Sequence, residues 1–220
     1  MIIGNRNPLI QCFLAITLLI FVFACGDGLL RIQISNSDGL LEQEYMIDID
    51  SLKQGFLISY HSNGADVFEK AEYLDDRLHG TRTLYYNSGQ PEIVENYLQD
   101  ILTDTLYLYY ESGAIKMKSY FEMGVHSGIN ISYYENGKIK EEVLFAENME
   151  QGPFTEYHEN GELSWTGQYL NGDNEFGELT QFDVKGVMIK KMICDSLGIC
   201  ATIWTIEKGD IAPAYVRTSN

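Results

Sequence analysis

The sequence predicts an all-β protein: an elongated, single antiparallel β-meander of stacked hairpin repeats, each 24–25 residues long. Three observations predict it. A short phrase ending in glycine recurs along the chain, apolar and polar residues alternate on both sides of it, and turn-forming residues separate the copies. The glycines are Gly39, Gly64, Gly89, Gly113, Gly137, Gly161 and Gly186, at spacings of 25, 25, 24, 24, 24 and 25 residues. A fixed period of this length indicates small units that are stable only when stacked.

Residues 1–24 are predicted to be a signal peptide. Arg6 is their only charge, and the apolar run that follows is short for a membrane span. The run ends in Val22-Phe23-Ala24-Cys25, which resembles the lipobox of bacterial lipoproteins apart from the bulky Phe23. We therefore expect cleavage before Cys25, a fatty-acyl anchor such as palmitate on that cysteine, and a place on the cell membrane or outer membrane, facing the periplasm or the cell surface. An ordinary signal peptide and an uncleaved anchor are the alternatives.

The chain is strongly acidic, with a formal net charge of −17 from 15 Lys and Arg against 32 Asp and Glu. Removing residues 1–24 takes away Arg6 and no acid, so the mature charge is 14 − 32 = −18. Such a surface repels nucleic acid and anionic lipid headgroups. Nucleic-acid binding is therefore not expected.

Two cysteines lie near the C-terminus. Cys194 and Cys200 flank a turn-like stretch between two apolar runs. In an oxidising compartment they could close a disulfide across a hairpin, and two free thiols are the alternative. No further Cys or His lies nearby in sequence, so no metal site is expected here or elsewhere.

The repeats proper are expected in residues 55–193, after an N-terminal segment, 25–54, that holds a degenerate capping repeat. In the clearest copy we expect Glu135-Asn136-Gly137 to form a three-residue loop, a type I turn followed by glycine in the left-handed conformation. This loop pairs Tyr133 with Ile139, Ile131 with Glu141 and Ile129 with Val143, and in neighbouring copies Tyr109 with Ile115 and Tyr157 with Leu163.

Stacking the copies places aromatic residues in two columns, which we expect to form the core on one face of the sheet. The first column is Tyr60, Tyr85, Tyr109, Tyr133, Tyr157 and Phe182; the second is Tyr73, Tyr97, Phe121, Phe145 and Tyr169. Gly, Asn and Asp in the linkers predict a second turn between hairpins. The meander should have about fourteen strands. Residues 194–206 are expected to close it, and 207–220 to form a loose tail.

The opposite face should be polar except in the second and third repeats. There an apolar set is expected to project outward as a candidate partner patch: Leu84, Tyr86, Val94, Leu106, Leu108, Tyr110 and Tyr120. Exposed apolar patches of this kind usually mark a partner site. The alternative is that residues 26–54 fold over them.

The phrase G-x4-Y-Y-x-N-G and the linker Y-x-x-G-x-x-H-x-G resemble the MORN-repeat family, over about residues 39–193. The chain is most similar to bacterial MORN-variant proteins, some of which are described as antitoxin-like. The resemblance implies β-hairpin repeats in an elongated, twisted sheet and roles in binding and scaffolding. The linker histidine is kept only as His79 and His126, so no histidine-based function is implied.

No group of residues predicts catalysis. His61 and His158 hold the same repeat position four repeats apart, and no histidine has a motif partner. We expect a non-enzymatic, membrane-anchored lipoprotein without cofactors that binds or scaffolds an unknown protein of the cell envelope through its sheet face. An antitoxin or immunity-type protein and a purely structural acidic spacer are the alternatives.

Overall fold

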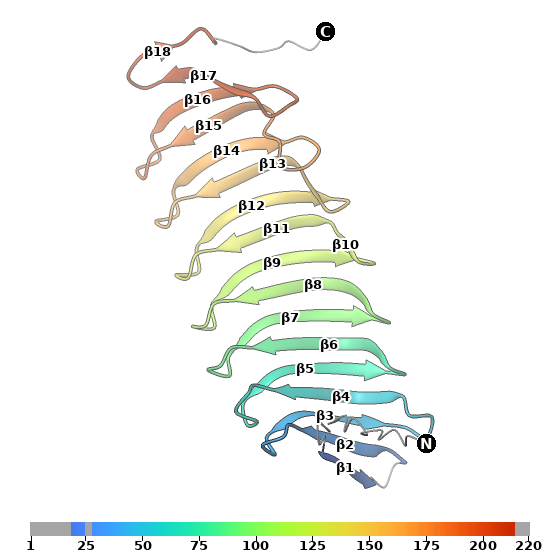
Figure 1. Cartoon of the computed structure of the whole chain (residues 1–220). Coiled ribbons are helices and arrows are strands. Elements are labelled where there is room, and N and C mark those ends of the chain that lie inside the picture. The colour runs from blue at the N-terminus through green and yellow to red at the C-terminus, as the bar shows by residue number, and fades with distance from the viewer. Residues whose placement is uncertain (1–18, 25–27, 214–220) are drawn as a thin grey trace, which may run out of the picture.

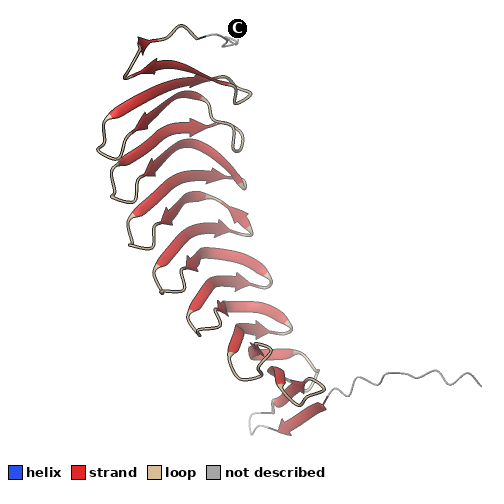
Figure 2. Cartoon of the chain, turned by 60° about the vertical axis from the view of Figure 1, so that its left-hand side comes forward, coloured by secondary structure: helices blue, strands red, loops and turns tan. Residues whose placement is uncertain are grey.

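The protein forms one open antiparallel β-sheet without helices in the residues described, 19–24 and 28–213 of a computed structural model (Figure 1). The strands stack along one long axis, with the first and last described strands at opposite ends of a twisted ribbon (Figures 1 and 2). Each strand pairs with its neighbours in sequence, except that the two-residue β10 pairs with β9 alone and β9 also pairs with β11. The predicted meander is confirmed.

The sheet has eighteen strands in the described residues, more than the fourteen expected. They are β1 (Leu19–Ala24), β2 (Leu30–Ser35), β3 (Leu41–Ile47), β4 (Lys53–Tyr60), β5 (Val67–Leu74), β6 (Arg77–Tyr85), β7 (Pro91–Leu98), β8 (Ile101–Tyr109), β9 (Ile115–Glu122), β10 (Val125–His126), β11 (Gly128–Tyr133), β12 (Ile139–Ala146), β13 (Met149–Tyr157), β14 (Leu163–Tyr169), β15 (Gly177–Phe182), β16 (Met188–Cys194), β17 (Cys200–Thr205) and β18 (Gly209–Asp210). The difference arises mainly at the two ends of the chain.

Each glycine-ended phrase except that of Gly64 forms the predicted three-residue loop; at Gly64 the His61 N–H donates to the Asp66 carbonyl, so that loop is one residue longer. In the loop between β11 and β12, the Gly137 N–H donates to the Tyr134 carbonyl at 2.9 Å and the Tyr134 N–H donates to the Lys138 carbonyl at 2.8 Å. Gly137 has φ +83°, in the left-handed region that glycine tolerates best. The pairs Tyr133–Ile139, Tyr109–Ile115 and Tyr157–Leu163 form as expected.

Beyond that first pair the predicted register is wrong by one residue. Glu141 lies opposite Ser132, not Ile131, and Val143 lies opposite Asn130, not Ile129, because Lys140 is an extra residue in β12. Such a β-bulge moves every later side chain of its strand to the other face. The same irregularity recurs in each hairpin, and the extra residues are Glu42, Phe68, Glu92, Lys116, Lys140, Ser164 and Ile189.

The two faces of the sheet differ in burial. We call inner the face that carries the buried strand residues, Ser35 excepted: Ile32, Leu57, Ser59, Ala71, Ser119, Asn130, Val143, Phe154, Leu179 and Cys194. Cross-strand pairing joins many of these in one row, as in Asn130–Val143–Phe154. The other face is called outer.

The bulges put the two aromatic columns on opposite faces, so the expectation of a single aromatic core face is wrong. The second column is inner, since Phe145 lies two residues from Val143 on the same strand. The first column is outer: the Tyr157 hydroxyl donates to Glu142, at 3.3 Å, on the side opposite Val143. The densest packing is on the inner face, where Val143, Phe154 and Leu179 pack with Trp165 and Tyr169.

The linkers form a second set of turns, as predicted. Two-residue loops such as Gln99–Asp100 and Glu147–Asn148 have positive φ at both positions, which matches the twist of a hairpin. The second residue of each of these loops also forms hydrogen bonds to the preceding repeat. The Asn148 N–H donates to the His126 carbonyl at 3.1 Å, and the His126 N–H donates to Asn148 Oδ1 at 2.8 Å.

A tyrosine ladder joins the repeats at the opposite edge. The hydroxyls of Tyr86, Tyr110 and Tyr134 each donate at 2.7 Å to the carbonyl of the first-column tyrosine in the next repeat. His158 Nε2 lies 3.1 Å from the Phe182 carbonyl in the equivalent place. The second tyrosine of each Tyr-Tyr phrase is therefore a connector between neighbouring hairpins.

Replacing Tyr134 by Phe should lower the free energy of unfolding by about 0.5–1.5 kcal/mol, because it deletes one hydrogen bond and leaves a carbonyl without that donor. Tyr133→Phe is the matched control, since its ring faces Lys118 and only the hydroxyl of Tyr134 belongs to the ladder. Urea unfolding followed by circular dichroism measures both. Equal losses in the two variants would contradict the ladder.

Both ends of the described chain continue the sheet. Residues 28–54 form β2, β3 and the start of β4, edge to edge with the repeats, so they do not fold over a sheet face. At the other end β17 continues the meander within the expected residues 194–206, but it does not close the sheet: the short strand β18, in the predicted loose tail, pairs with it. The expected cleavage before Cys25 would remove β1, and Cys25 itself lies outside the described residues.

Candidate docking surface

The predicted partner patch does not lie on one face. Leu106 pairs with the buried Ser119, and Leu108 with Met117 on the same strand, so both leucines are inner. Leu84 is inner as well, since it lies two residues from Arg82, which pairs with the buried Ala71. The cause is the bulge in each hairpin, which a strict two-residue alternation cannot represent.

The other four residues of the predicted patch also lie in different places. Val94 and Tyr120 project from the outer face, and Tyr120 is 42% exposed. Tyr86 and Tyr110 lie in the hairpin turns, where their hydroxyls belong to the tyrosine ladder. Of the predicted set, Tyr120 is thus the member that belongs to a strongly exposed apolar surface.

That surface is an apolar stripe on the outer face, next to the linker turns of β7 to β13. We call it the linker stripe, and its members are between 36% and 60% exposed: Leu98, Ile101, Tyr120, Val125, Ile129, Leu144 and Met149. Cross-strand pairs Leu98–Ile101 and Ile129–Leu144 make it continuous locally. The Tyr120 side chain lies against Gly128, beside Ile129. Exposed apolar side chains gathered in this way are typical of a partner site.

Acidic residues lie along one side of the linker stripe. Asp100, Glu122 and Glu147 are exposed at successive linker turns or next to them, and none forms an ion pair within the described part of the chain. Of the nearby lysines of the outer face, Lys116 stands next to the hairpin turn and Lys118 in the middle of β9, and their ammonium groups lie over the rings of Tyr110 and Tyr133. The stripe therefore combines apolar side chains with uncompensated negative charge.

Near the start of the second repeat, charged side chains on the inner face form ion pairs with one another. Arg82 donates to Glu69 at 2.5 Å and to Glu95 at 2.9 Å, and the Tyr97 hydroxyl donates to Glu95 at 3.2 Å. Although burial opposes it, bonding to the two carboxylates raises the pKa of the Arg82 guanidinium. Because these groups satisfy one another, they have a structural role.

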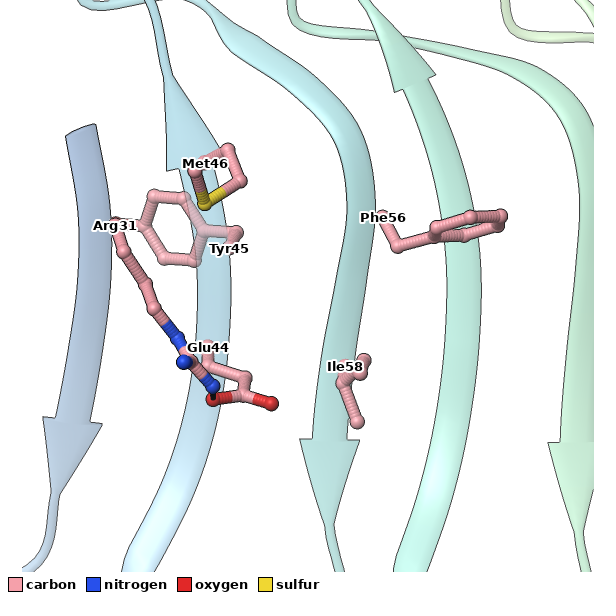
Figure 3. A pocket seen from close by; sticks show the side chains of 6 residues that line it. All are labelled: Arg31, Glu44, Tyr45, Met46, Phe56 and Ile58. Carbon is pink, nitrogen blue, oxygen red and sulfur yellow. Dashed lines mark hydrogen bonds and ion pairs between the residues drawn. The ribbon is translucent and has the colours of Figure 1, made fainter. Parts of the chain in front are cut away.

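Near the N-terminal end of the outer face lies a pocket of about 250 Å³ (Figure 3). Arg31, Tyr60 and Gln33 all donate to the Glu44 carboxylate. Burial disfavours the charge, yet these three bonds hold the pKa of Glu44 below its usual value, while burial and the Glu44 contact raise the pKa of Tyr60 to about 12. A carboxylate with three internal donors is a poor ligand site, although Phe56 beside it is 46% exposed. No pattern in the sequence indicates this cluster.

His126 is part of an aromatic stack on the inner face. Its ring lies 4.8 Å from that of Phe121 and 3.8 Å from that of Phe145, nearly parallel to both. Its Nε2 is buried without a hydrogen-bond partner, and burial lowers its pKa. By register His126 corresponds to Leu78 and Leu102 rather than to His79. The side chain is therefore a packing element.

Replacing His126 by Leu, the residue at the equivalent positions, should flatten the acid side of the stability profile. The folded-state pKa of His126 is lowered, so the unfolded chain takes up a proton first as pH falls below about 6.5. Wild-type stability should then decrease through this window, and His126→Leu should lose that decrease. Urea midpoints between pH 5 and 7.5 measure it. A slope unchanged in His126→Leu would contradict this role.

Cys194 and Cys200 are joined by a disulfide across the β16–β17 hairpin. Together with Glu175 they form a cluster of metal-ligand residue types, but both sulfurs are held in the disulfide.

Among the described residues, no helix is long and apolar enough to cross a membrane.

Comparison with known families agrees with the repeat structure. The family described as MORN repeat variant matches residues 78–99, 127–147 and 150–171. Each matched segment covers one hairpin: β6–β7, β11–β12 and β13–β14. Among curated proteins, none matches the chain.

Proposed function

Since the chain carries MORN repeat variants, we propose that it is a non-enzymatic, membrane-anchored lipoprotein that binds a partner protein of the cell envelope through its outer sheet face. The linker stripe is the observation that carries this function. It presents Tyr120, Ile129 and Leu144 at 42%, 60% and 36% exposure on a sheet whose described residues include no second layer. Side chains of this kind bury apolar area when a partner docks.

The repeat structure supports a scaffold role for this surface. Hydrogen bonds join successive hairpins at both edges of the sheet, so the strands that carry the stripe are held in fixed positions relative to one another. A pre-organised surface loses less conformational entropy when it binds. The predicted anchor at Cys25 would hold the surface at the membrane.

The test is quantitative cross-linking of the full-length protein in its own envelope. Ile129→Ser with Leu144→Ser should abolish specific cross-linked partners, whereas the matched control, Leu197→Ser with Ile206→Ser, should retain them. Both control residues are exposed, at 63% and 57%, but lie far from the stripe near β17. Cys25→Ala reports on the anchor: it should release the protein from the membrane. An identical set of partners in both double variants would contradict docking at the stripe.

A further inference from the structure

The linker stripe extends over several hairpin repeats, so its side chains are spaced along the sheet at the distance between repeats. Two strands separate equivalent positions of successive repeats, which corresponds to about 10 Å along the sheet. Ile101, Val125 and Met149 hold equivalent positions in three successive repeats, each on the strand that follows a linker turn. Each of the three turns also has one acidic residue in it or directly before it. Asp100, Glu122 and Glu147 mark three successive repeats.

A bound segment cannot pair with the sheet here through its main chain. The stripe lies on the face of β7 to β13, and each of these strands except the two-residue β10 has hydrogen-bonded strands on both sides. β10 pairs with β9 on one side, and on the other the N–H and carbonyl of His126 are bonded to Asn148. A segment laid on an apolar face must therefore satisfy its own backbone groups. An α-helix does so, and seven of its residues span about 10.5 Å, close to the repeat pitch.

The negative charge beside the stripe indicates which side chains one flank of such a helix should carry. The acidic groups lie along the linker-turn side of the stripe, and the lysines Lys116 and Lys118 are held over tyrosine rings. Positive side chains placed once every seven residues would each meet one acidic turn. Asp100 accepts a hydrogen bond from the Leu78 N–H at 2.8 Å, but none of the three carboxylates has an ion-pair partner among the described residues. Such carboxylates beside an apolar surface favour Lys or Arg over neutral or acidic neighbours.

Resting on the proposed protein-binding role, we propose that the partner presents an amphipathic α-helix that lies across the strands, with an apolar face on the linker stripe and Lys or Arg along one flank at heptad spacing. The helix runs along the axis of the ribbon. Its basic flank faces Asp100, Glu122 and Glu147.

The test uses two fluorescent 21-residue helical peptides with leucine on one face. One carries lysine along one flank every seven residues, and the other carries glutamate at the same places. With full-length protein in nanodiscs, anisotropy should show at least tenfold tighter binding of the lysine peptide. Ile129→Ser with Leu144→Ser should abolish that binding.

The charge variants separate a specific flank from general attraction to an acidic protein. Glu122→Gln with Glu147→Gln should weaken the lysine peptide about tenfold. Glu135→Gln with Glu159→Gln removes the same charge from exposed hairpin turns at the other edge and should have little effect. Equal weakening by both pairs would overturn the inference.

Two further outcomes would also overturn it: equal affinity for the two peptides, or binding to anionic phospholipid vesicles in place of either peptide. These results are distinguishable from failure of the proposed function. If the native cross-linked partner is lost in the Ile129, Leu144 variant but retained with Glu122 and Glu147 neutralised, protein binding stands and the basic helix is wrong.

Discussion

Replacing Phe154 by Ala should lower the free energy of unfolding by about 3–5 kcal/mol, the largest effect expected for a single side chain in this protein. Phe154 is 2% exposed and packs with Val143 and Leu179 at the centre of the inner-face cluster. It also stacks on Tyr169, with ring centroids 4.5 Å apart. Its removal leaves a cavity in a sheet that has no second layer, in the described residues, to fill it.

Denaturant unfolding followed by tryptophan fluorescence measures this loss, because Trp165 packs against the same cluster. Leu144→Ala is the control: Leu144 is the next residue to Val143 but lies on the outer face, 36% exposed, so the cost should be small. Similar losses for the two variants would mean that the faces have been assigned wrongly.

Replacing Gly167 by Ala should cost about 1–3 kcal/mol through overpacking. A Cβ at this position would lie 2.7 Å from Phe154 Cε1, 2.8 Å from Phe154 Cζ and 3.0 Å from Leu179 Cγ. Gly167 has no left-handed φ, so the cost comes from crowding and not from the backbone. The aromatic ring effectively occupies the place of the missing side chain.

A double-mutant cycle tests that reason. Phe154→Leu shortens the group that Gly167→Ala would meet, so the combined variant should be more stable than the sum of the two single losses predicts. The comparison uses urea midpoints of the four proteins. Simple additivity would show that the glycine is required for another reason.

The fold was predictable because its signals are local and repeated. The glycine after Glu135-Asn136 predicts a particular loop, and that loop forms, with the Tyr133–Ile139 pair that it implies. The disulfide between Cys194 and Cys200 also follows from a hairpin with a short turn. Period and turn chemistry together are sufficient for the meander.

The faces were not predictable in the same way. Lys140 is an ordinary strand residue in sequence, yet it is the extra residue that moves Glu141 and Val143 to the inner face. No composition signal distinguishes it, since Phe68 and Ser164 hold the same place in other hairpins. For this reason the predicted patch was divided between faces, and the linker stripe, with Ile129 its most exposed member, was missed.

The central claim is that a partner protein docks on the linker stripe, and a photo-reactive amino acid placed at Ile129 tests it most directly. Ile129 is 60% exposed, so a benzoylphenylalanine there should not disturb the sheet. On irradiation in the native envelope, the claim predicts a discrete cross-linked protein from position 129 and none from the equally exposed position Leu197. The same products from both positions, or none from Ile129, would contradict it.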